Sequence, residues 1–340
     1  MNPFADAAAP VRQVARTSFV RSLIACWLLA GCLTTVTRAD EPVPETVDRV
    51  RYQLNPRLRV GTGWYGSPIR SVSGRVLTCD NQTLKIQVQN EDGSYKIQQI
   101  DAAAVVDVVP GITTDGLQKA MLDYQQGKFA NAQIGFASYL LNRDPAQPRL
   151  AWMTQWVGVR LIAAGYLAGQ WEQTFNLVSQ IDQRPLPPFL LAELPLMWMR
   201  AEHPQTAAAA RVAAAPWTSK GTPATRLLAA SILQHDPADK TGIATLRALA
   251  GDTNRPLLAR YAQVLIWRNE TPPSVLRNWK QWKRKCDALP IAMQQGPLAL
   301  VADRLQTGGK SVDARPLWLS VEQFATRPDL RFRAATQLKR

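Results

Sequence analysis

Hydrophobic and polar residues alternate along residues 64–110, and this alternation predicts short β-strands. The clearest case is Leu84, Ile86 and Val88, which are separated by polar residues and therefore lie on one face of a strand. The residues NEDG at 90–93 are typical of a hairpin turn, and hydrophobic residues return after them. We predict four or five short strands in this part of the chain.

A unit of this size is too small for two packed sheets, so closure into a small barrel would remove its open edges. Its length and strand rhythm resemble those of SH3-like or Sm-like barrels. The resemblance implies a β-barrel-like unit and assigns no ligand to it.

After Pro110 the hydrophobic spacing becomes helical, and one pattern occurs twice. Residues 124–129 read YQQGKF and residues 166–171 read YLAGQW. Residues 113–145 resemble a tetratricopeptide repeat, a helix pair that stacks on its neighbours because it cannot bury its own hydrophobic stripe. The resemblance implies packing roles for Ala120, Tyr124, Gly127, Phe129, Ala132, Phe136, Tyr166, Gly169 and Trp171.

Gly127 and Gly169 are expected at the bends of two helix hairpins, where glycine adopts a left-handed conformation with little strain. The two copies are 42 residues apart, whereas the family repeats every ~34 residues. The pattern fades downstream, where prolines and glycines separate further predicted helices. These are 189–202, 205–214, 222–234, 238–250, 255–268, 273–286, 290–306, 312–325 and 329–338.

Together these patterns predict a mainly α fold, in which a small four- or five-stranded β-barrel-like unit precedes a solenoid of antiparallel helix pairs. The predicted ranges are a signal segment at 1–39, a linker at 40–63, the β unit at 64–110 and the helical repeat domain at 111–340.

Residues 1–39 have the features of an export signal. Arginines precede the apolar run LIACWLLA at 23–30, which is too short to cross a bilayer, since a crossing takes about 20 residues. The run ends in LAGC at 29–32, which resembles the lipobox of bacterial lipoproteins. The resemblance implies a signal at 1–31, acylation of Cys32 and, because Leu33 follows, sorting to the outer membrane.

Cleavage after Ala39 is the alternative, and it would leave a periplasmic or secreted protein that begins at Asp40. Both interpretations predict an extracytoplasmic protein.

The composition of 340 residues, 46% hydrophobic and 19% charged, is enough for a sizeable core. The net charge is +14; the signal segment contains four arginines and one aspartate, so the rest of the chain keeps +11. This surplus favours anionic membrane surfaces, cell-envelope polymers or acidic proteins as partners. Export argues against nucleic acid. Cys79 and Cys286 either pair in an oxidising compartment or remain buried thiols.

No motif predicts catalysis, a metal or a cofactor. GTGWYG at 61–66 matches a dinucleotide-binding fingerprint. Dinucleotide binding requires a helix directly after this motif, and the sequence that follows is not helical in pattern. TGGKS at 307–311 lacks the first glycine of a P-loop and is predicted as a loop between helices. His203 and His235 have no partner at catalytic or metal-binding spacing.

A basic segment, RNWKQWKRKC at 277–286, combines Trp279 and Trp282 with five cations. It suits an anionic surface, or else its tryptophans pack inside the helical array while the charges are solvated. The basic surface would consist of Arg277, Lys280, Lys283, Arg284 and Lys285.

Three functions follow from these observations. The first is a non-enzymatic scaffold that binds unknown protein partners on a concave helical face. The second is binding of a polyanion or membrane surface through residues 277–286. The third is an enzyme whose site is assembled only by the fold, in the groove of the helices.

Overall fold

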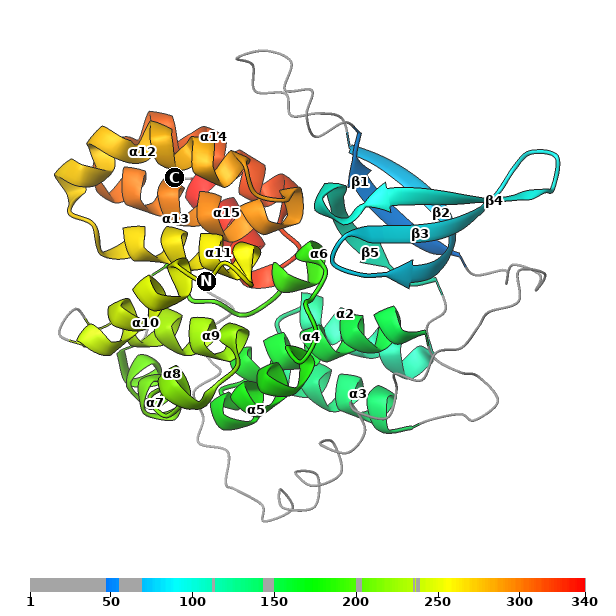
Figure 1. Ribbon diagram of the computed structural model, residues 1–340, viewed down its shortest axis with the longest axis horizontal. Helices are drawn as coiled ribbons and strands as arrows, with labels where there is room; N and C mark the ends of the chain where they lie inside the picture. Colours follow the sequence, from blue (N-terminus) through cyan, green and yellow to red (C-terminus); the bar gives the residue numbers. More distant parts are fainter. Residues whose placement is uncertain are drawn as a thin grey trace.

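The computed structural model describes residues 47–54, 69–111, 114–142, 150–199, 204–234, 236 and 239–339. In the view of Figure 1, an arc of helices begins beneath a small sheet and returns to the level of that sheet at its C-terminal end. The predicted signal segment with Cys32, the GTGWYG motif and both histidines lie outside the described residues.

Five strands form one antiparallel sheet in the order β4-β3-β2-β1-β5. They are β1 Asp48–Gln53, β2 Ile69–Cys79, β3 Thr83–Gln89, β4 Tyr95–Asp101 and β5 Val105–Val109. Leu84 and Ile86 are buried and Lys85 between them is exposed, as the alternation predicts. Gly93, with φ 81°, lies in the turn between β3 and β4.

The first strand of this sheet was not predicted, because it lies in residues 40–63, which we expected to be a linker. Its buried face carries Asp48 beside Val50, and the carboxylate interrupts the apolar alternation. Asp48 accepts hydrogen bonds from the N–H groups of Val76 (2.8 Å) and Gly111 (2.9 Å). Burial raises the pKa of Asp48, and these two hydrogen bonds oppose the rise.

The sheet is open, which differs from the barrel closure expected from its size. β4 and β5 are its edges, and no ladder joins them among the described residues. Helices and the segment that contains α6 cover one part of the sheet instead, so most of its apolar residues are buried without closure, while Tyr95 and Ile97 on the edge strand β4 are exposed.

Helix hairpins follow the sheet. The first two consist of α2 Asp115–Gln125 with α3 Phe129–Leu141, and of α4 Ala151–Leu167 with α5 Trp171–Ile181. Gly127 and Gly169 lie at their bends with φ 79° and 80°. At the first bend Gly127 N–H donates to the Tyr124 carbonyl and Lys128 N–H to the Asp123 carbonyl, and the second bend repeats this pair of bonds. This Schellman pattern satisfies the last carbonyls of each helix.

A third bend has the same geometry. Gly309, with φ 77°, joins α13 Gln295–Thr307 to α14 Ser311–Phe324. Gly309 N–H donates to the Gln306 carbonyl and Lys310 N–H to the Leu305 carbonyl. The middle three residues of TGGKS, 308–310, therefore form the loop between two helices, while Thr307 ends α13 and Ser311 begins α14.

The other helices begin at proline in most cases, since proline fixes φ where no intrahelical N–H bond is needed. They are α6 Pro188–Leu191, α7 Pro204–Ala214, α8 Trp217–Lys220, α9 Pro223–Leu233, α10 Lys240–Ala250, α11 Pro256–Ile266, α12 Pro272–Asp287 and α15 Pro328–Leu338, with 3₁₀ turns η1 Ala102–Ala104, η2 Trp267–Asn269 and η3 Ile291–Gln294.

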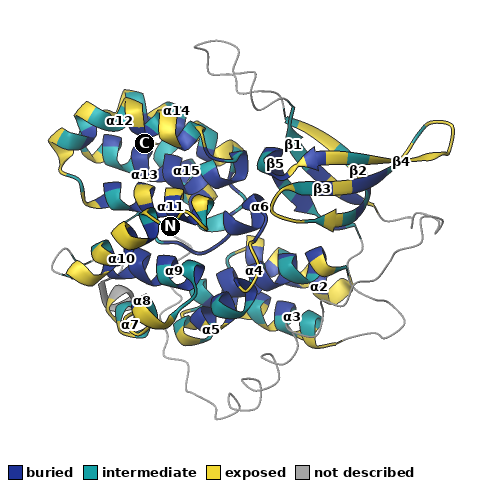
Figure 2. Ribbon diagram, viewed as in Figure 1, coloured by how far each residue is buried: buried dark blue, intermediate teal, exposed yellow. Residues whose placement is uncertain are grey.

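The helix predicted at 189–202 is wrong over most of its length. Within residues 186–199 only α6 is helical, and the rest is extended or turned. Every residue from Leu186 to Leu196 is buried, and α6 lies at the centre of the molecule in Figure 2. An apolar run that is buried on all sides shows no periodicity, so a helix and an extended segment cannot be told apart in it.

Side chains from distant helices hydrogen-bond the backbone of this central segment, residues 186–199. Arg327 Nη1 donates to the carbonyls of Leu194 (2.9 Å) and Leu196 (3.1 Å). Arg268 Nη1 donates to the Met197 carbonyl, and Met197 N–H donates to Ser231 Oγ at 3.1 Å. Buried backbone without regular structure needs such partners, so the segment and the helices around it depend on each other.

Close packing also holds the end of the central segment. A Cβ on Gly296 would lie 2.1 Å from the Trp198 indole, so only glycine fits beneath that ring. Trp198 meets Tyr261 edge to face with ring centroids 5.0 Å apart, and the Tyr261 hydroxyl donates to the Met293 carbonyl at 3.0 Å.

The Gly309 bend can be tested by substitution. Gly309→Ala should lower the free energy of unfolding by about 1–2 kcal/mol, because a left-handed φ strains a residue with a Cβ. Nothing lies within 4 Å of the position of that Cβ, so the loss reports the backbone conformation alone. Gly309→Asn is the matched control and should lose less, since asparagine tolerates this region. Urea denaturation measures both variants, and an alanine variant as stable as the wild type would contradict the left-handed bend.

Candidate functional site

Helix α4 joins the helical part of the protein to the sheet through two tryptophans that are one turn apart. Trp152 Nε1 donates to the Val76 carbonyl of β2 (3.1 Å), and Trp156 Nε1 donates to the Val108 carbonyl of β5 (2.8 Å). Both indoles are buried. A buried indole N–H usually finds a partner, and here the partners fix how the sheet sits on the helix.

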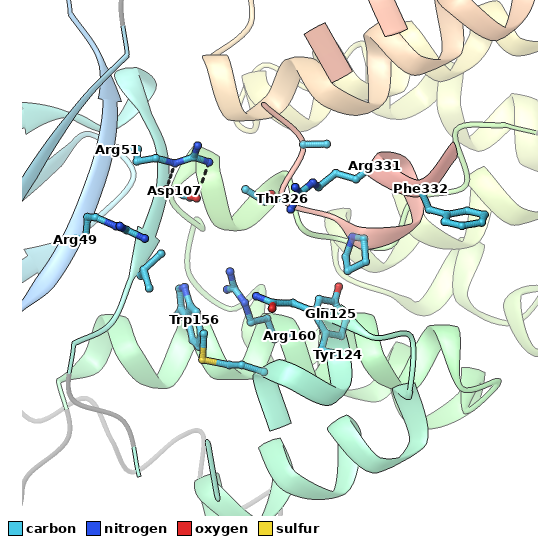
Figure 3. Close-up of a pocket in the computed structure, with 14 residues that line it drawn as sticks. Arg49, Arg51, Asp107, Tyr124, Gln125, Trp156, Arg160, Thr326, Arg331 and Phe332 are labelled. Carbon is cyan, nitrogen blue, oxygen red and sulfur yellow. Dashed lines mark hydrogen bonds and ion pairs between the residues drawn. The ribbon is translucent and has the colours of Figure 1, made fainter. Parts of the chain in front are cut away.

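A pocket of about 520 Å³ opens at this junction. Its walls come from three parts of the chain: strands β1 and β5, helices α2 and α4, and the loop and first turn of α15 at residues 325–332. Figure 3 shows the side chains of these three walls around one space. The volume is within the range of small-molecule sites in proteins.

Positive charge dominates the pocket. Arg49 and Arg51 come from β1, Arg160 from α4 and Arg331 from α15, and Asp107 is the one carboxylate among the lining residues. Asp107 is already engaged, because Arg51 donates to it through Nε at 2.9 Å and through Nη2 at 2.8 Å. This bidentate bond raises the pKa of Arg51. The three other arginines give the site its surplus of positive charge.

Arg160 lies on the floor of the pocket. Its guanidinium carbon is 3.6 Å from the centre of the Trp156 ring, which it covers. Its Nη1 is buried and has no hydrogen-bond partner among the described residues, and neither has the buried hydroxyl of Tyr124 beside it. Burial lowers the pKa of Arg160, and the negative charge of Glu193 is the main factor that opposes this. An arginine nevertheless stays protonated.

The remaining lining residues divide into polar and apolar ones. Gln125 and Thr326 can donate further hydrogen bonds, while Met121, Pro328 and Phe332 provide apolar surface. Among the described residues, no histidine or cysteine lines the pocket and Asp107 is the one lining carboxylate, bonded to Arg51. The arrangement is therefore suited to binding an anion.

Hydrogen bonds to residues outside the pocket fix its C-terminal wall, residues 325–332. Gln295 Oε1 accepts hydrogen bonds from the N–H groups of Thr326 (3.0 Å) and Arg327 (3.4 Å). The Arg327 side chain reaches the central segment and also pairs with Asp329 at 2.6 Å. Because these bonds fix the loop, the wall has a defined position relative to α4.

The residues predicted to pack the repeats lie in the first two hairpins. Ala120, Tyr124, Phe129, Ala132 and Phe136 are buried. Tyr166 and Trp171 are half-buried against the core, and Gly169 is exposed at its bend. Tyr124 meets Phe129 and Phe136 edge to face, with ring centroids 5.8 Å and 6.1 Å apart. Tyr124 also lines the pocket, so one residue that was predicted to pack the repeats is also part of the candidate site.

The basic segment 277–286 lies on α12. Trp282 is buried and stacks on Trp267 with ring centroids 4.9 Å apart, so this indole packs inside and is not available to a surface partner. Lys283 is half-buried and pairs with Asp287 at 2.9 Å. The other predicted cations are exposed; they are Arg277, Lys280, Arg284 and Lys285.

Cys79 and Cys286 are free thiols. Burial raises the pKa of each to about 12, so both stay protonated near neutral pH and react poorly.

Within the described ranges, no group of three or more histidine, cysteine, aspartate or glutamate side chains is arranged to hold a metal ion. None of the helices in the part of the chain that the structure describes has an apolar stretch long enough to span a bilayer.

Comparison with known proteins finds no family model, no curated protein and no solved structure that matches this chain. The tetratricopeptide resemblance therefore stays a prediction, while the mainly helical fold with its small antiparallel sheet is shown by the structure.

The two indole bonds to the sheet should each contribute to stability. Trp152→Phe and Trp156→Phe should each lower the free energy of unfolding by about 1 kcal/mol, because each removes a hydrogen bond to a backbone carbonyl. Trp171→Phe controls for the smaller ring, since no hydrogen bond of its indole is found among the described residues. Chemical denaturation gives all three values. Losses no larger than that of Trp171→Phe would contradict the docking role of the two bonds.

Proposed function

We propose that this protein is an exported, non-enzymatic binding protein that recognises an anionic group of its partner in the pocket between the sheet and the helices. The observation that supports it most directly is the charge of that pocket: four arginines face one space that contains a single carboxylate, and that carboxylate is paired. Export rests on the sequence of residues 1–39.

The proposal also includes a tetratricopeptide-like arrangement of the helix hairpins. Two successive hairpins with glycine bends and aromatic packing support a tetratricopeptide-like origin for residues 115–181. In such arrays a partner commonly occupies the concave face. Here the central segment is buried among the helices, so we place the binding site at the junction with the sheet instead.

The exposed cations of α12 support a second candidate function, which is attachment to an anionic surface. Electrostatic attraction would dominate through these residues, because Trp282 is buried and Trp279 is half-buried against the core. Such binding would be weak and sensitive to salt.

Isothermal titration of the full mature protein with citrate and with inorganic pyrophosphate tests the main proposal. At least one of these anions should bind with 1:1 stoichiometry. Arg331→Gln and Arg160→Gln should each weaken binding by about tenfold or more, since a hydrogen bond to a charged group contributes roughly 1.5–3 kcal/mol.

The control variant is Lys280→Glu combined with Arg284→Glu on α12, which should bind as the wild type does. If this double variant lost binding while Arg331→Gln kept it, α12 would be the site and the second candidate would hold. Absence of saturable binding to these two anions and to phosphorylated organic ligands would refute the pocket proposal.

A further inference from the structure

The hydrogen-bond donors that line the pocket limit which chemical groups can bind in it. Apart from the Arg51–Asp107 pair, its polar side chains include the donors Arg49, Arg160, Arg331 and Gln125. Thr326 can donate its hydroxyl hydrogen as well, although its oxygen already accepts from Gln295 Nε2 at 3.2 Å. The Trp156 N–H is already bonded to Val108. The ligand group should therefore be a strong acceptor that can be approached from several directions.

The three unpaired arginines come from different walls. Figure 3 shows Arg49 reaching inward from β1, Arg160 rising from α4 and Arg331 reaching inward from α15. A carboxylate presents two acceptor oxygens in one plane, whereas a phosphate presents oxygens in tetrahedral directions. Donors that converge from three sides fit the tetrahedral group better.

Arg160 is prepared for such a group before the ligand arrives. Its guanidinium carbon lies 3.6 Å from the centre of the Trp156 ring, and its Nη1 has no hydrogen-bond partner among the described residues, so the planar fork keeps N–H groups that can donate to a ligand. A side chain that is already immobilised loses little further entropy on binding. A lysine at this position would keep the positive charge but would lack the planar guanidinium and its fixed arrangement of N–H donors.

Net charge favours a dianion over a monoanion. With Arg51 neutralised by Asp107, three positive charges remain around the space. Glu193, outside the lining residues, offsets part of the charge of Arg160. A single negative charge would still leave positive charge uncompensated in a partly buried site, and like charges close together are unfavourable.

The space is larger than one phosphate group needs. Apolar side chains of Met121, Pro328 and Phe332 line part of it, and Phe332 is 41% exposed. This surface suits the carbon body of an organic phosphate.

We infer that the pocket binds a phosphomonoester, with its dianionic phosphate held between Arg49, Arg160 and Arg331 and its organic body against the apolar wall. This inference rests on the proposed anion-binding function and specifies its ligand class. The phosphate can belong to a soluble phosphorylated sugar or to a lipid headgroup, which share this chemistry.

Titration with glucose 6-phosphate and with succinate at equal ionic strength tests the inference, because both carry two negative charges. Glucose 6-phosphate should bind at least tenfold more tightly. Arg49→Gln and Arg331→Gln, at exposed positions where folding should be preserved, should each reduce its affinity about tenfold. Arg160→Lys should remove most of the preference for phosphate over succinate, and Lys280→Gln on α12 should change nothing. Circular dichroism melting confirms that each variant is folded.

Vesicles that contain phosphatidic acid distinguish the two sources of the phosphate. Binding to vesicles but not to glucose 6-phosphate, with the same dependence on Arg49 and Arg331, would support a lipid phosphate. Succinate or a polyglutamate peptide bound as tightly as glucose 6-phosphate, with arginine dependence intact, would overturn the phosphate inference and leave the anion-binding function standing. Failure of every anion to bind would overturn both.

Discussion

Hydrogen bonds from arginine side chains to the backbone of the central segment tie the C-terminal end of the helical arc to the interior of the molecule. Residues 192–199 have no helix or sheet to satisfy their carbonyl groups, and donors come from Arg327, which precedes α15, and from Arg268 in η2. Leaving such groups unpaired in the interior would cost about 1–3 kcal/mol each. The same bonds bring residues 325–332 next to α2, α4 and the sheet.

The pocket is a consequence of that closure. Its C-terminal wall carries Arg331 and depends on Gln295 and Arg327 for its position. Its floor depends on Trp156, which bonds to the sheet through its N–H and supports Arg160 with its ring. The same indole holds the sheet and supports an arginine of the proposed binding pocket, so a change in how the sheet packs on α4 should alter that pocket.

Local signals in the sequence predicted local structure well. The glycine spacing at 127 and 169 predicted two bends that the structure contains, because a left-handed bend needs glycine whatever surrounds it. The third bend at Gly309 lacked the aromatic partners that made the first two recognisable. The alternation at 84–88 predicted β3, while the buried Asp48 hid β1. In the central segment burial on all sides removed the periodicity.

The pocket could not be predicted, since its arginines are separated by up to 282 positions in the sequence; the lone Arg160 within an apolar helix was the one local sign.

Hydrogen–deuterium exchange across residues 189–199 tests the closure most directly, because regular secondary structure does not protect most of this segment. If side chains of distant helices hold it in the interior, its amides should exchange as slowly as those of the buried helix α9. Exchange as fast as that of the exposed turn at 90–94 would show that the segment is open to solvent, and would contradict both the closed arc and the pocket that depends on it.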